Sequence, residues 1–315
     1  MAVENETKRK KLEKPQKQKE KREIKKGEAK AEAKSSVQME VKNNPNKKRK
    51  QVFPFGNYKN YYGYRIGPGH EVKEDPRIKV LKKEWFEGKD CLDIGCNSGV
   101  ITIHIAKEYN CHSILGLDID SGLIEDAFWY LRKITKVESA QKKQARDSSV
   151  KVVQGVNSLE QCTDASSNEG TNKSLNYHSS GERDLSDIVS FRRENFVQSH
   201  CPPDKHYDTI ICLSVTKWIH LNWGDDGLIT LFTKIWRLLH PGGVFVLEPQ
   251  PWESYEKNRR VSETTASNYR SIMFRPESFQ EILLDKIGFR MVEDVTSGLS
   301  GTRTGFDRPI FAFYK

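Results

Sequence analysis

The fold is decided by the stretch CLDIGCNSGVITIHIA, residues 91–106. Its start, Cys91–Ile94, is a short apolar run that ends at a glycine, and Val100–Tyr109 has the apolar periodicity of a helix. The glycines between the two let the backbone approach a ligand closely, and backbone N–H groups at the start of the helix can bind it. The stretch therefore predicts a strand, a loop and a helix that hold a cofactor.

Strand and helix signals continue to alternate along the chain. Ser113–Leu117 is apolar and ends at Asp118, and Leu123–Ile134 has helix periodicity. Further strands are predicted over residues 187–191, 207–213, 244–248, 289–295 and 309–314, and further helices over 227–239 and 276–286. This order predicts an α/β fold with a parallel sheet and helices on both of its faces.

The spacing of the loop glycines distinguishes between cofactors. Gly95 and Gly99 form G-x-x-x-G, whereas dinucleotide sites need G-x-G-x-x-G and phosphate-binding loops end in Gly-Lys-Ser/Thr. Asp118 ends the next strand, where a carboxylate can accept hydrogen bonds from ribose hydroxyls. An ordinary tight turn with a helix cap is the alternative, but it does not explain the loop, the carboxylate and Leu-His-Pro-Gly-Gly at 239–243 in this order.

These features together resemble the class I methyltransferases, which bind S-adenosyl-L-methionine. We therefore expect a Rossmann-like, mostly parallel seven-stranded sheet. Asn195 and Phe196 follow the third strand of this arrangement, a position that lies beside the adenine in this fold. An alternative for Phe196 is a place in the hydrophobic core.

Composition divides the chain into a tail and a domain. Residues 1–51 carry 18 Lys and Arg against 8 Glu, while the remainder has 34 basic and 35 acidic side chains, so the net charge of +9 belongs to the tail. We predict a disordered basic tail over 1–52 and a methyltransferase domain over 53–315. The domain contains a polar insert at about 137–187, rich in Ser, Asn, Gln and Lys, which we also predict to be disordered.

The tail contains KRKK at Lys8–Lys11 and KKRK at Lys47–Lys50. Such clusters are typical of nuclear localisation signals, although a solvated segment and a nonspecific grip on RNA are alternatives. We expect a nuclear protein with a cytoplasmic fraction. No apolar run is long enough for a signal peptide or a membrane span, so no membrane association is expected.

The six cysteines form neither a metal-binding nor a disulfide pattern. They are Cys91, Cys96, Cys111, Cys162, Cys201 and Cys212. None belongs to a Cys-x-x-Cys pair and no His cluster accompanies them, so we expect no metal site and reduced thiols.

Three further segments carry a resemblance to one family. They are NYKNYYGYR at 57–65, LSVTKWIHLNWGDDGL at 213–228 and LEPQPWESY at 247–255. Together they resemble the bicoid-interacting-protein-three family of RNA methyltransferases, and within it the branch that caps small nuclear RNAs. The resemblance runs from about residue 53 to 315, but the tail and the insert match nothing in the family pattern.

The resemblance implies methyl transfer from S-adenosylmethionine to the γ-phosphate of a small non-coding RNA that carries a 5′ triphosphate. It further implies La-related ribonucleoprotein partners and no DNA specificity. Its acceptor-side residues are Tyr61, Arg65 and Lys217. Its cofactor-side residues are Tyr62, Arg77, Gly95, Cys96, Asn97, Asp118, Ile119, Asn195, Phe196 and Leu213. The lead-in DPRIKVL around Arg77, which would bind the methionine carboxylate, departs from the family pattern.

The residue types suit such a reaction. A phosphate oxygen is already anionic, so alignment in a site that excludes water can suffice without a general base. Arg65 can bind phosphate oxygens bidentately, and Lys217 offers a point charge. Three alternatives stay open: a methyltransferase for RNA 5′ monophosphates, one for a protein or small molecule, and an RNA-binding scaffold that retains a cofactor pocket.

Overall fold

The computed structural model describes residues 52–65, 75–154, 183–200, 204–296 and 307–315, with the backbone alone over 142–154. The strands are β1 (Asp90–Ile94), β2 (Ser113–Asp118), β3 (Val189–Arg193), β4 (Tyr207–Leu213), β5 (Leu239–Glu248), β6 (Met291–Asp294) and β7 (Phe311–Tyr314). The α-helices are α2 (Tyr61–Arg65), α3 (Pro76–Val80), α4 (Val100–Tyr109), α5 (Ser121–Gln154), α6 (Leu185–Ile188), α7 (Thr216–Leu238), α8 (Trp252–Asn258), α9 (Glu263–Ser271) and α10 (Phe279–Glu281). Three short helices of other types are η3 (Lys83–Trp85), η4 (Pro276–Ser278) and η5 (Ile282–Ile287).

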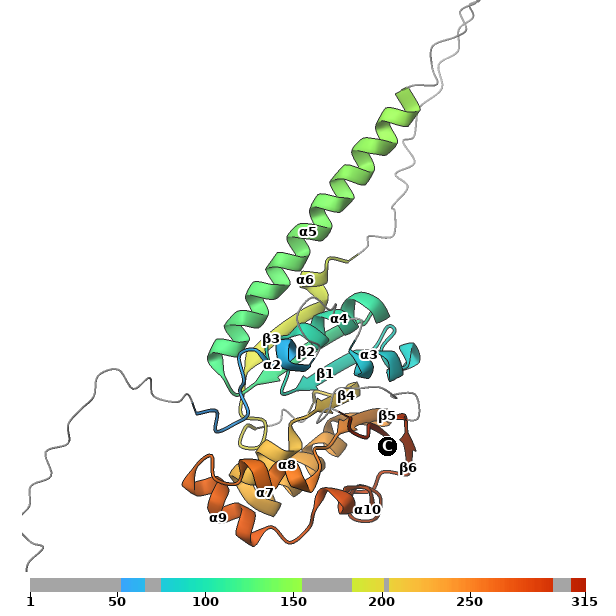
Figure 1. Ribbon diagram of the computed structural model, residues 1–315. Coiled ribbons are helices and arrows are strands. Elements are labelled where there is room, and N and C mark those ends of the chain that lie inside the picture. Colours follow the sequence, from blue (N-terminus) through green and yellow to red (C-terminus); the bar gives the residue numbers. More distant parts are fainter. Residues whose placement is uncertain (1–51, 66–74, 155–182, 201–203, 297–306) are drawn as a thin grey trace, which may run out of the picture. The chain divides into compact units, whose positions relative to one another are not determined.

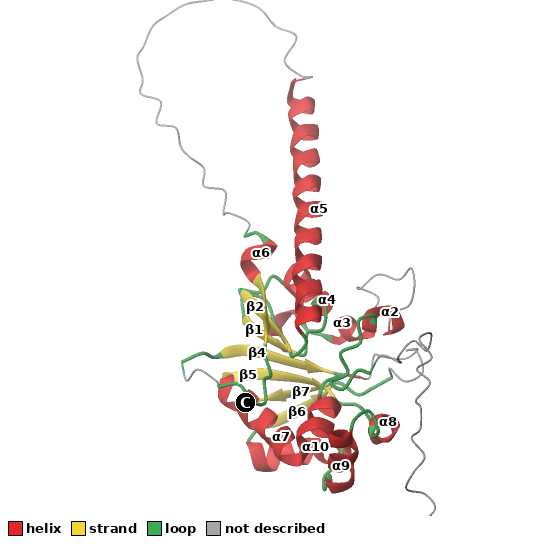
Figure 2. Cartoon of the chain, turned by 90° about the vertical axis from the view of Figure 1, so that its left-hand side faces the viewer, coloured by secondary structure: helices red, strands yellow, loops and turns green. Residues whose placement is uncertain are grey.

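All seven strands form one sheet, in the order β3-β2-β1-β4-β5-β7-β6 (Figure 1 and Figure 2). The first five in chain order are parallel, and β7 runs antiparallel to both β5 and β6. Helices cover both faces of the sheet (Figure 2). The predicted fold class, a mostly parallel seven-stranded class I methyltransferase sheet, is confirmed.

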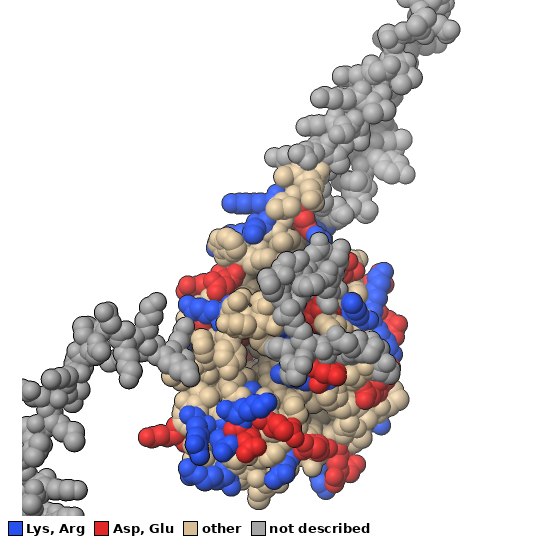
Figure 3. All heavy atoms as spheres, in the orientation of Figure 1, with Lys and Arg blue, Asp and Glu red and all other residues tan. Residues whose placement is uncertain are grey.

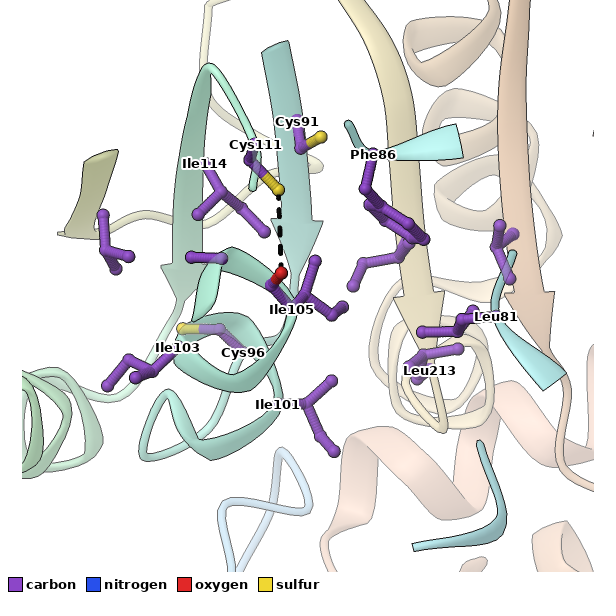
Figure 4. Close-up of a cluster of buried hydrophobic side chains, with 14 of the residues drawn as sticks. Leu81, Phe86, Cys91, Cys96, Ile101, Ile103, Ile105, Cys111, Ile114 and Leu213 are labelled. Atoms are coloured by element: carbon purple, nitrogen blue, oxygen red, sulfur yellow. Dashed lines mark hydrogen bonds between the residues drawn. The ribbon is translucent and has the colours of Figure 1, made fainter. Parts of the chain in front are cut away.

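The strands separate two hydrophobic cores because successive strand side chains point to opposite faces. Cys91 and Ile114 face the first core with α4 and α5, while Leu92 and Leu115 face the second with α7 and η5. Figure 4 shows part of the first core, where Ile105 of α4 is fully buried and its carbonyl accepts a bond from the Cys111 thiol at 3.9 Å. Each such buried side chain contributes about 1.5–3 kcal/mol.

The helix predicted over 123–134 is much longer than the sequence pattern suggested. It begins at Ser121 and continues to Gln154, so the first part of the predicted insert is helical rather than disordered. Its continuation after residue 136 lacks an apolar stripe, but Lys, Glu, Gln and Ala are good helix formers, and Glu138 pairs with Lys107 of α4 at 2.9 Å. The end of the insert also contains α6, while 155–182 and the tail at 1–51 lie outside the described residues.

The helix predicted to start at Gly227 begins earlier, at Thr216. Gly224 breaks its geometry with φ 65° and ψ −165°, so two helical pieces meet at a kink. Glycine tolerates this backbone conformation, which interrupts the helical periodicity at Gly224. The sequence pattern therefore predicted only the second piece. The first piece carries Lys217 and Trp218 to the end of β4.

The four described cysteines, Cys91, Cys96, Cys111 and Cys212, are buried free thiols. Within the described ranges, no group of three or more His, Cys, Asp or Glu side chains could hold a metal ion. None of the helices in the described part of the chain is both long and apolar enough to cross a membrane.

Candidate functional site

A pocket of about 760 Å³ opens at the carboxyl ends of β1, β2 and β4, the edge where α/β folds bind ligands. The predicted site residues that line it are Tyr61, Gly95, Asn97, Asp118, Ile119, Asn195, Phe196 and Leu213. Segments that are distant in the sequence thus meet around one cavity.

The loop after β1 can approach a ligand because two of its residues must be glycine. Gly95 has φ +78°, and a Cβ there would lie 2.3 Å from Val215 Cγ2. Gly99 has φ +70°, and a Cβ there would lie 2.5 Å from the Phe191 ring. Asn97 also adopts a left-handed conformation, with φ 53°. The loop therefore turns sharply and passes directly into α4.

Asp118 is positioned to accept hydrogen bonds from the hydroxyl groups of a ligand. Its Oδ2 accepts a hydrogen bond from the Asn97 N–H and its Oδ1 accepts one from the Asp120 N–H, both at 2.9 Å. Burial raises its pKa above the ordinary value, while the backbone donors oppose that rise. A carboxylate has about four acceptor sites, so this one keeps capacity for ribose hydroxyls.

Residues 53–58, here called the strap, form one wall of the pocket through Phe55, Gly56 and Asn57. The Asn57 amide donates to Asp120 Oδ2, and the Asn97 amide donates to the Tyr58 carbonyl at 3.3 Å. Asp120 also caps α5, because its Oδ1 accepts from the Gly122 N–H at 2.8 Å. The strap is thus tied directly to the loop and to the end of β2.

The strap also packs on α7. The Phe55 ring stacks on Trp223 with centroids 5.8 Å apart, and a Cβ on Gly56 would lie only 2.0 Å from Trp218 Nε1. The Asn222 amide donates to the Pro54 carbonyl at 2.9 Å. The position of the strap over the pocket therefore depends on glycine at residue 56.

Two predicted cofactor residues, Tyr62 and Cys96, pack against the first core instead of lining the pocket. A third, Arg77, is 1% exposed. Its Nη2 lies 2.7 Å from Asp75 Oδ2 and its Nη1 lies 3.7 Å from Glu248 Oε2. The Arg77 guanidinium therefore has protein carboxylates as partners, and its predicted role toward the cofactor stays a prediction.

Tyr61 and Arg65 belong to a buried network that surrounds Glu248. Arg65 Nη2 donates to Glu248 Oε1 at 2.8 Å, and Arg65 Nη1 donates to the Tyr61 hydroxyl at 3.3 Å. The Tyr61 hydroxyl in turn donates to Ser214 Oγ at 3.1 Å, and Ser214 Oγ donates to Glu248 Oε2. The predicted acceptor-side residue Arg65 thus lies behind Tyr61, held by a carboxylate.

Lys217 is a buried cation, with 5% of its surface exposed. Its Nζ donates to Ser254 Oγ at 2.9 Å and lies 4.3 Å from the centroid of the Trp218 ring. Burial, with a smaller effect of Arg308, lowers its pKa to about 7. Among the described residues, no carboxylate forms an ion pair with it.

Comparison of the sequence with known proteins identifies one family. The profile of the Bicoid-interacting protein 3 (Bin3) family matches residues 207–315. A probable RNA methyltransferase of Arabidopsis thaliana is 64% identical over 269 residues, which span 85% of this chain and 83% of that protein. This chain belongs to the Bicoid-interacting protein 3 family.

Two further relatives extend the comparison. The U6 snRNA methylphosphate capping enzyme of Drosophila melanogaster is 35% identical, over 88% of this chain and 80% of that protein. The human 7SK snRNA methylphosphate capping enzyme is 37% identical over 85% of this chain, which spans only 40% of the human protein. The predicted family is confirmed, and as a methyltransferase of this family the protein uses S-adenosylmethionine as its methyl donor.

Three residues of the hydrogen-bonded network around Tyr61 were not predicted from the sequence. Ser214 follows the predicted Leu213 and bonds to Tyr61, while Glu248 ends β5 and Arg308 lies just before β7. Ser214 and Glu248 lie inside the quoted segments at 213–228 and 247–255, so their motifs were a usable signal. Arg308 stands in no such motif, and only the folded chain brings it to the site.

Proposed function

We propose that this protein transfers a methyl group from S-adenosylmethionine to the terminal phosphate at the 5′ end of a small non-coding RNA, and that a 5′ triphosphate is the acceptor. The observation that carries the proposal is Lys217, a buried ammonium without a carboxylate partner in the described part of the chain, next to the pocket-lining Trp218. A buried charge is costly unless it is paired. A phosphate would be its missing partner.

The cofactor supplies an activated methyl group when bound, and the residues of the pocket fit it. Asp118 would accept the ribose hydroxyls, Asn195 and Phe196 would contact the adenine, and the loop at Gly95–Gly99 would let its backbone approach the amino acid portion. The remaining requirement is an acceptor oxygen in line with the methyl group. Holding that geometry can provide most of the rate enhancement.

The acceptor side needs no general base, because a phosphate oxygen is already anionic. Lys217 would hold the terminal phosphate, and the Tyr61 hydroxyl, fixed by Ser214 and Arg65, would orient one of its oxygens. Arg65 acts by positioning Tyr61, since Glu248 already holds its guanidinium. Too many direct contacts would draw charge from the attacking oxygen, so a small number of donors suits the reaction.

An RNA body would contact more than the pocket. Lys and Arg side chains, with some Asp and Glu among them, gather over the region of α8 and α9 (Figure 3). Lys257 lies in α8, and Arg270 lies in the last turn of α9. Neutralising phosphates with such side chains gives salt-dependent, sequence-independent affinity.

The names of the human and Drosophila relatives, which refer to small nuclear RNAs, support a small nuclear RNA as the substrate. They also support action in the nucleus, with the predicted import signals in the tail as the means. La-related ribonucleoprotein partners remain part of the proposal. Import is tested by deleting residues 1–51, after which the protein should lose its nuclear enrichment.

The reaction is tested by offering labelled S-adenosylmethionine with one RNA that carries a 5′ triphosphate, a monophosphate or a hydroxyl. We expect labelling of the triphosphate RNA above the other two. Lys217→Ala should lose transfer while it keeps cofactor affinity, and the exposed Lys286→Ala, in η5, is the matched control that should keep both. Equal labelling of all three RNAs would refute the proposal, and cofactor binding without labelling would favour the scaffold alternative.

A further inference from the structure

Arg308 reaches the acceptor side of the pocket from the far end of the chain. Its Nη1 donates to Ser214 Oγ at 2.8 Å, although 94 residues separate the two in the sequence. Ser214 itself lines the pocket. The guanidinium of Arg308 is therefore within one hydrogen bond of the pocket wall, on the same side as Tyr61.

Ser214 is held in an unusual backbone conformation that fixes its hydroxyl. Its φ is 64°, in the left-handed region that non-glycine residues seldom adopt. The Ser214 N–H donates to the Glu248 carbonyl at 3.0 Å, and the Gln250 amide donates to the Ser214 carbonyl. Conformations of this kind persist where the surroundings over-determine them, and they cluster at functional sites.

The hydroxyl of Ser214 joins three charged or polar groups at one point. It accepts from Tyr61 and Arg308 and donates to Glu248. Because Glu248 takes the hydroxyl proton, the oxygen lone pairs are left for the tyrosine and the arginine. Ser214 and Glu248 thereby set the direction of the Arg308 guanidinium.

The charges near Arg308 and Lys217 favour the binding of an anion. Arg308 acts electrostatically on Lys217 and lowers its pKa, an effect of like charges that face each other. Glu248 offsets the charge of Arg308, with which it shares the Ser214 hydroxyl, but Lys217 has no carboxylate partner among the described residues. A terminal phosphate in contact with both cations would supply the negative charge that Lys217 lacks.

We infer that Arg308 is a second cationic contact of the RNA terminal phosphate, with Ser214 and Glu248 as the residues that position it. The inference rests on the proposed function and adds to it a residue that determines specificity for a phosphorylated end. Arginine suits this place because its planar fork can bind two oxygens at once, whereas Lys217 offers a point charge.

The experiment compares Arg308→Ala and Arg308→Lys with the full-length wild type. The exposed Arg290→Ala, at the opposite end of the neighbouring strands, is the matched control. For each protein, the KM and kcat for methyl transfer to 5′-triphosphate RNA are measured. The Kd values of S-adenosylhomocysteine, of the triphosphate RNA and of the same RNA with a 5′ hydroxyl are measured as well.

We expect Arg308→Ala to raise the KM and the Kd for triphosphate RNA by about tenfold or more, as for a lost charged hydrogen bond. Its affinity for hydroxyl RNA and for S-adenosylhomocysteine should stay unchanged, and Arg308→Lys should recover part of the loss. A merely structural role would weaken binding of both RNAs equally, and that result would overturn the inference, as would unchanged KM. If Arg308→Ala does not fold, the test uses Arg308→Lys, for which the Kd for triphosphate RNA is compared with the Kd for hydroxyl RNA in the same way.

Wild-type labelling separates this inference from the proposed function. A wild-type protein that does not methylate 5′-phosphorylated RNA refutes both. A wild-type protein that does so, together with an Arg308→Ala variant of normal KM, refutes the role of Arg308 alone.

Discussion

Arg65 Nη2 lies 2.8 Å from Glu248 Oε1, and both side chains are at most 3% exposed. The pair connects α2, next to the strap, with the end of β5, 183 residues later. Burial alone would raise the pKa of Glu248, but Arg65, Arg77 and Arg308 outweigh it and hold the pKa below its ordinary value. Glu248 is therefore a buried anion around which the acceptor side of the site is assembled.

Removing the charge of Glu248 should strongly destabilise the fold. Glu248→Gln breaks the buried ion pair of Arg65 with Glu248 and leaves Asp75, 3.4 Å from Arg65 Nε, as a remaining carboxylate partner. Breaking a buried pair by removing one charge costs about 3–5 kcal/mol of unfolding free energy. Urea unfolding at neutral pH measures it. The control is Glu293→Gln, which breaks the half-exposed pair with Lys82 at 2.7 Å and should cost no more than about 1 kcal/mol. Equal losses in the two variants would contradict the central position of Glu248.

Gly56→Ala should weaken cofactor binding by displacing the strap. The added Cβ would lie 2.0 Å from Trp218 Nε1, and overpacking of this kind costs about 1–3 kcal/mol. We expect the Kd of S-adenosylhomocysteine to rise about tenfold, measured by calorimetry. Gly88→Ala is a matched control, because Gly88 has φ +68° against +69° for Gly56 but nothing within 4 Å of its Cβ position. Similar Kd values for both variants would show that backbone strain, not the strap contact, was responsible.

Asp118→Asn should lower cofactor affinity without preventing folding. The carboxylate would lose charge-assisted bonds to ribose hydroxyls, each worth about 1.5–3 kcal/mol, which corresponds to a tenfold or greater rise in Kd. Asp90→Asn is the control, because Asp90 begins β1 at the opposite end of the strands from the pocket. Unchanged cofactor affinity in Asp118→Asn would remove Asp118 from the site.

The charge of Lys217 should make RNA recognition depend on pH. Burial lowers its pKa to about 7, so the side chain is an ammonium below that pH and becomes neutral above it. Since only the ammonium attracts phosphate, kcat/KM for triphosphate RNA should fall as the pH rises above about 7. The value of kcat should change less, because bound phosphate stabilises the charged form and raises the pKa in the complex.

Lys217→Arg separates this titration from that of the RNA phosphate. Arginine stays charged throughout the range, so the fall above pH 7 should disappear even if activity is lower overall. A fall of the same size in Lys217→Arg would assign the titration to another group.

Much of the fold could be predicted because its signals are local. Val100–Tyr109 and Tyr207–Leu213 have the bounds that apolar periodicity gave them. Helices α2, α8 and α9 were not predicted, because they are short or polar and are stabilised by tertiary contacts. One such contact is the stacking of Trp252 on Tyr269, with centroids 4.9 Å apart.

The site, like the fold, has one part that local sequence signals predict and another part that they do not. Gly95 and Asp118 lie on one strand–loop–helix–strand unit, so their spacing in the sequence predicted that both would line the pocket. The pairing of Arg65 with Glu248 and the approach of Arg308 to Ser214 join segments more than 90 residues apart. No local pattern encodes these contacts, and they change the expected role of Arg65 from binding phosphate to positioning Tyr61.

The most direct test of the central claim is the chemical position of the transferred methyl group. Triphosphate RNA is incubated with the protein and S-adenosylmethionine, digested to nucleotides, and the 5′-terminal nucleotide is analysed by mass spectrometry. We expect a nucleoside triphosphate that carries one added methyl on its terminal phosphate and resists a phosphatase that removes unmodified phosphates. A methyl group on a base, on a ribose or on the protein itself would contradict the claim.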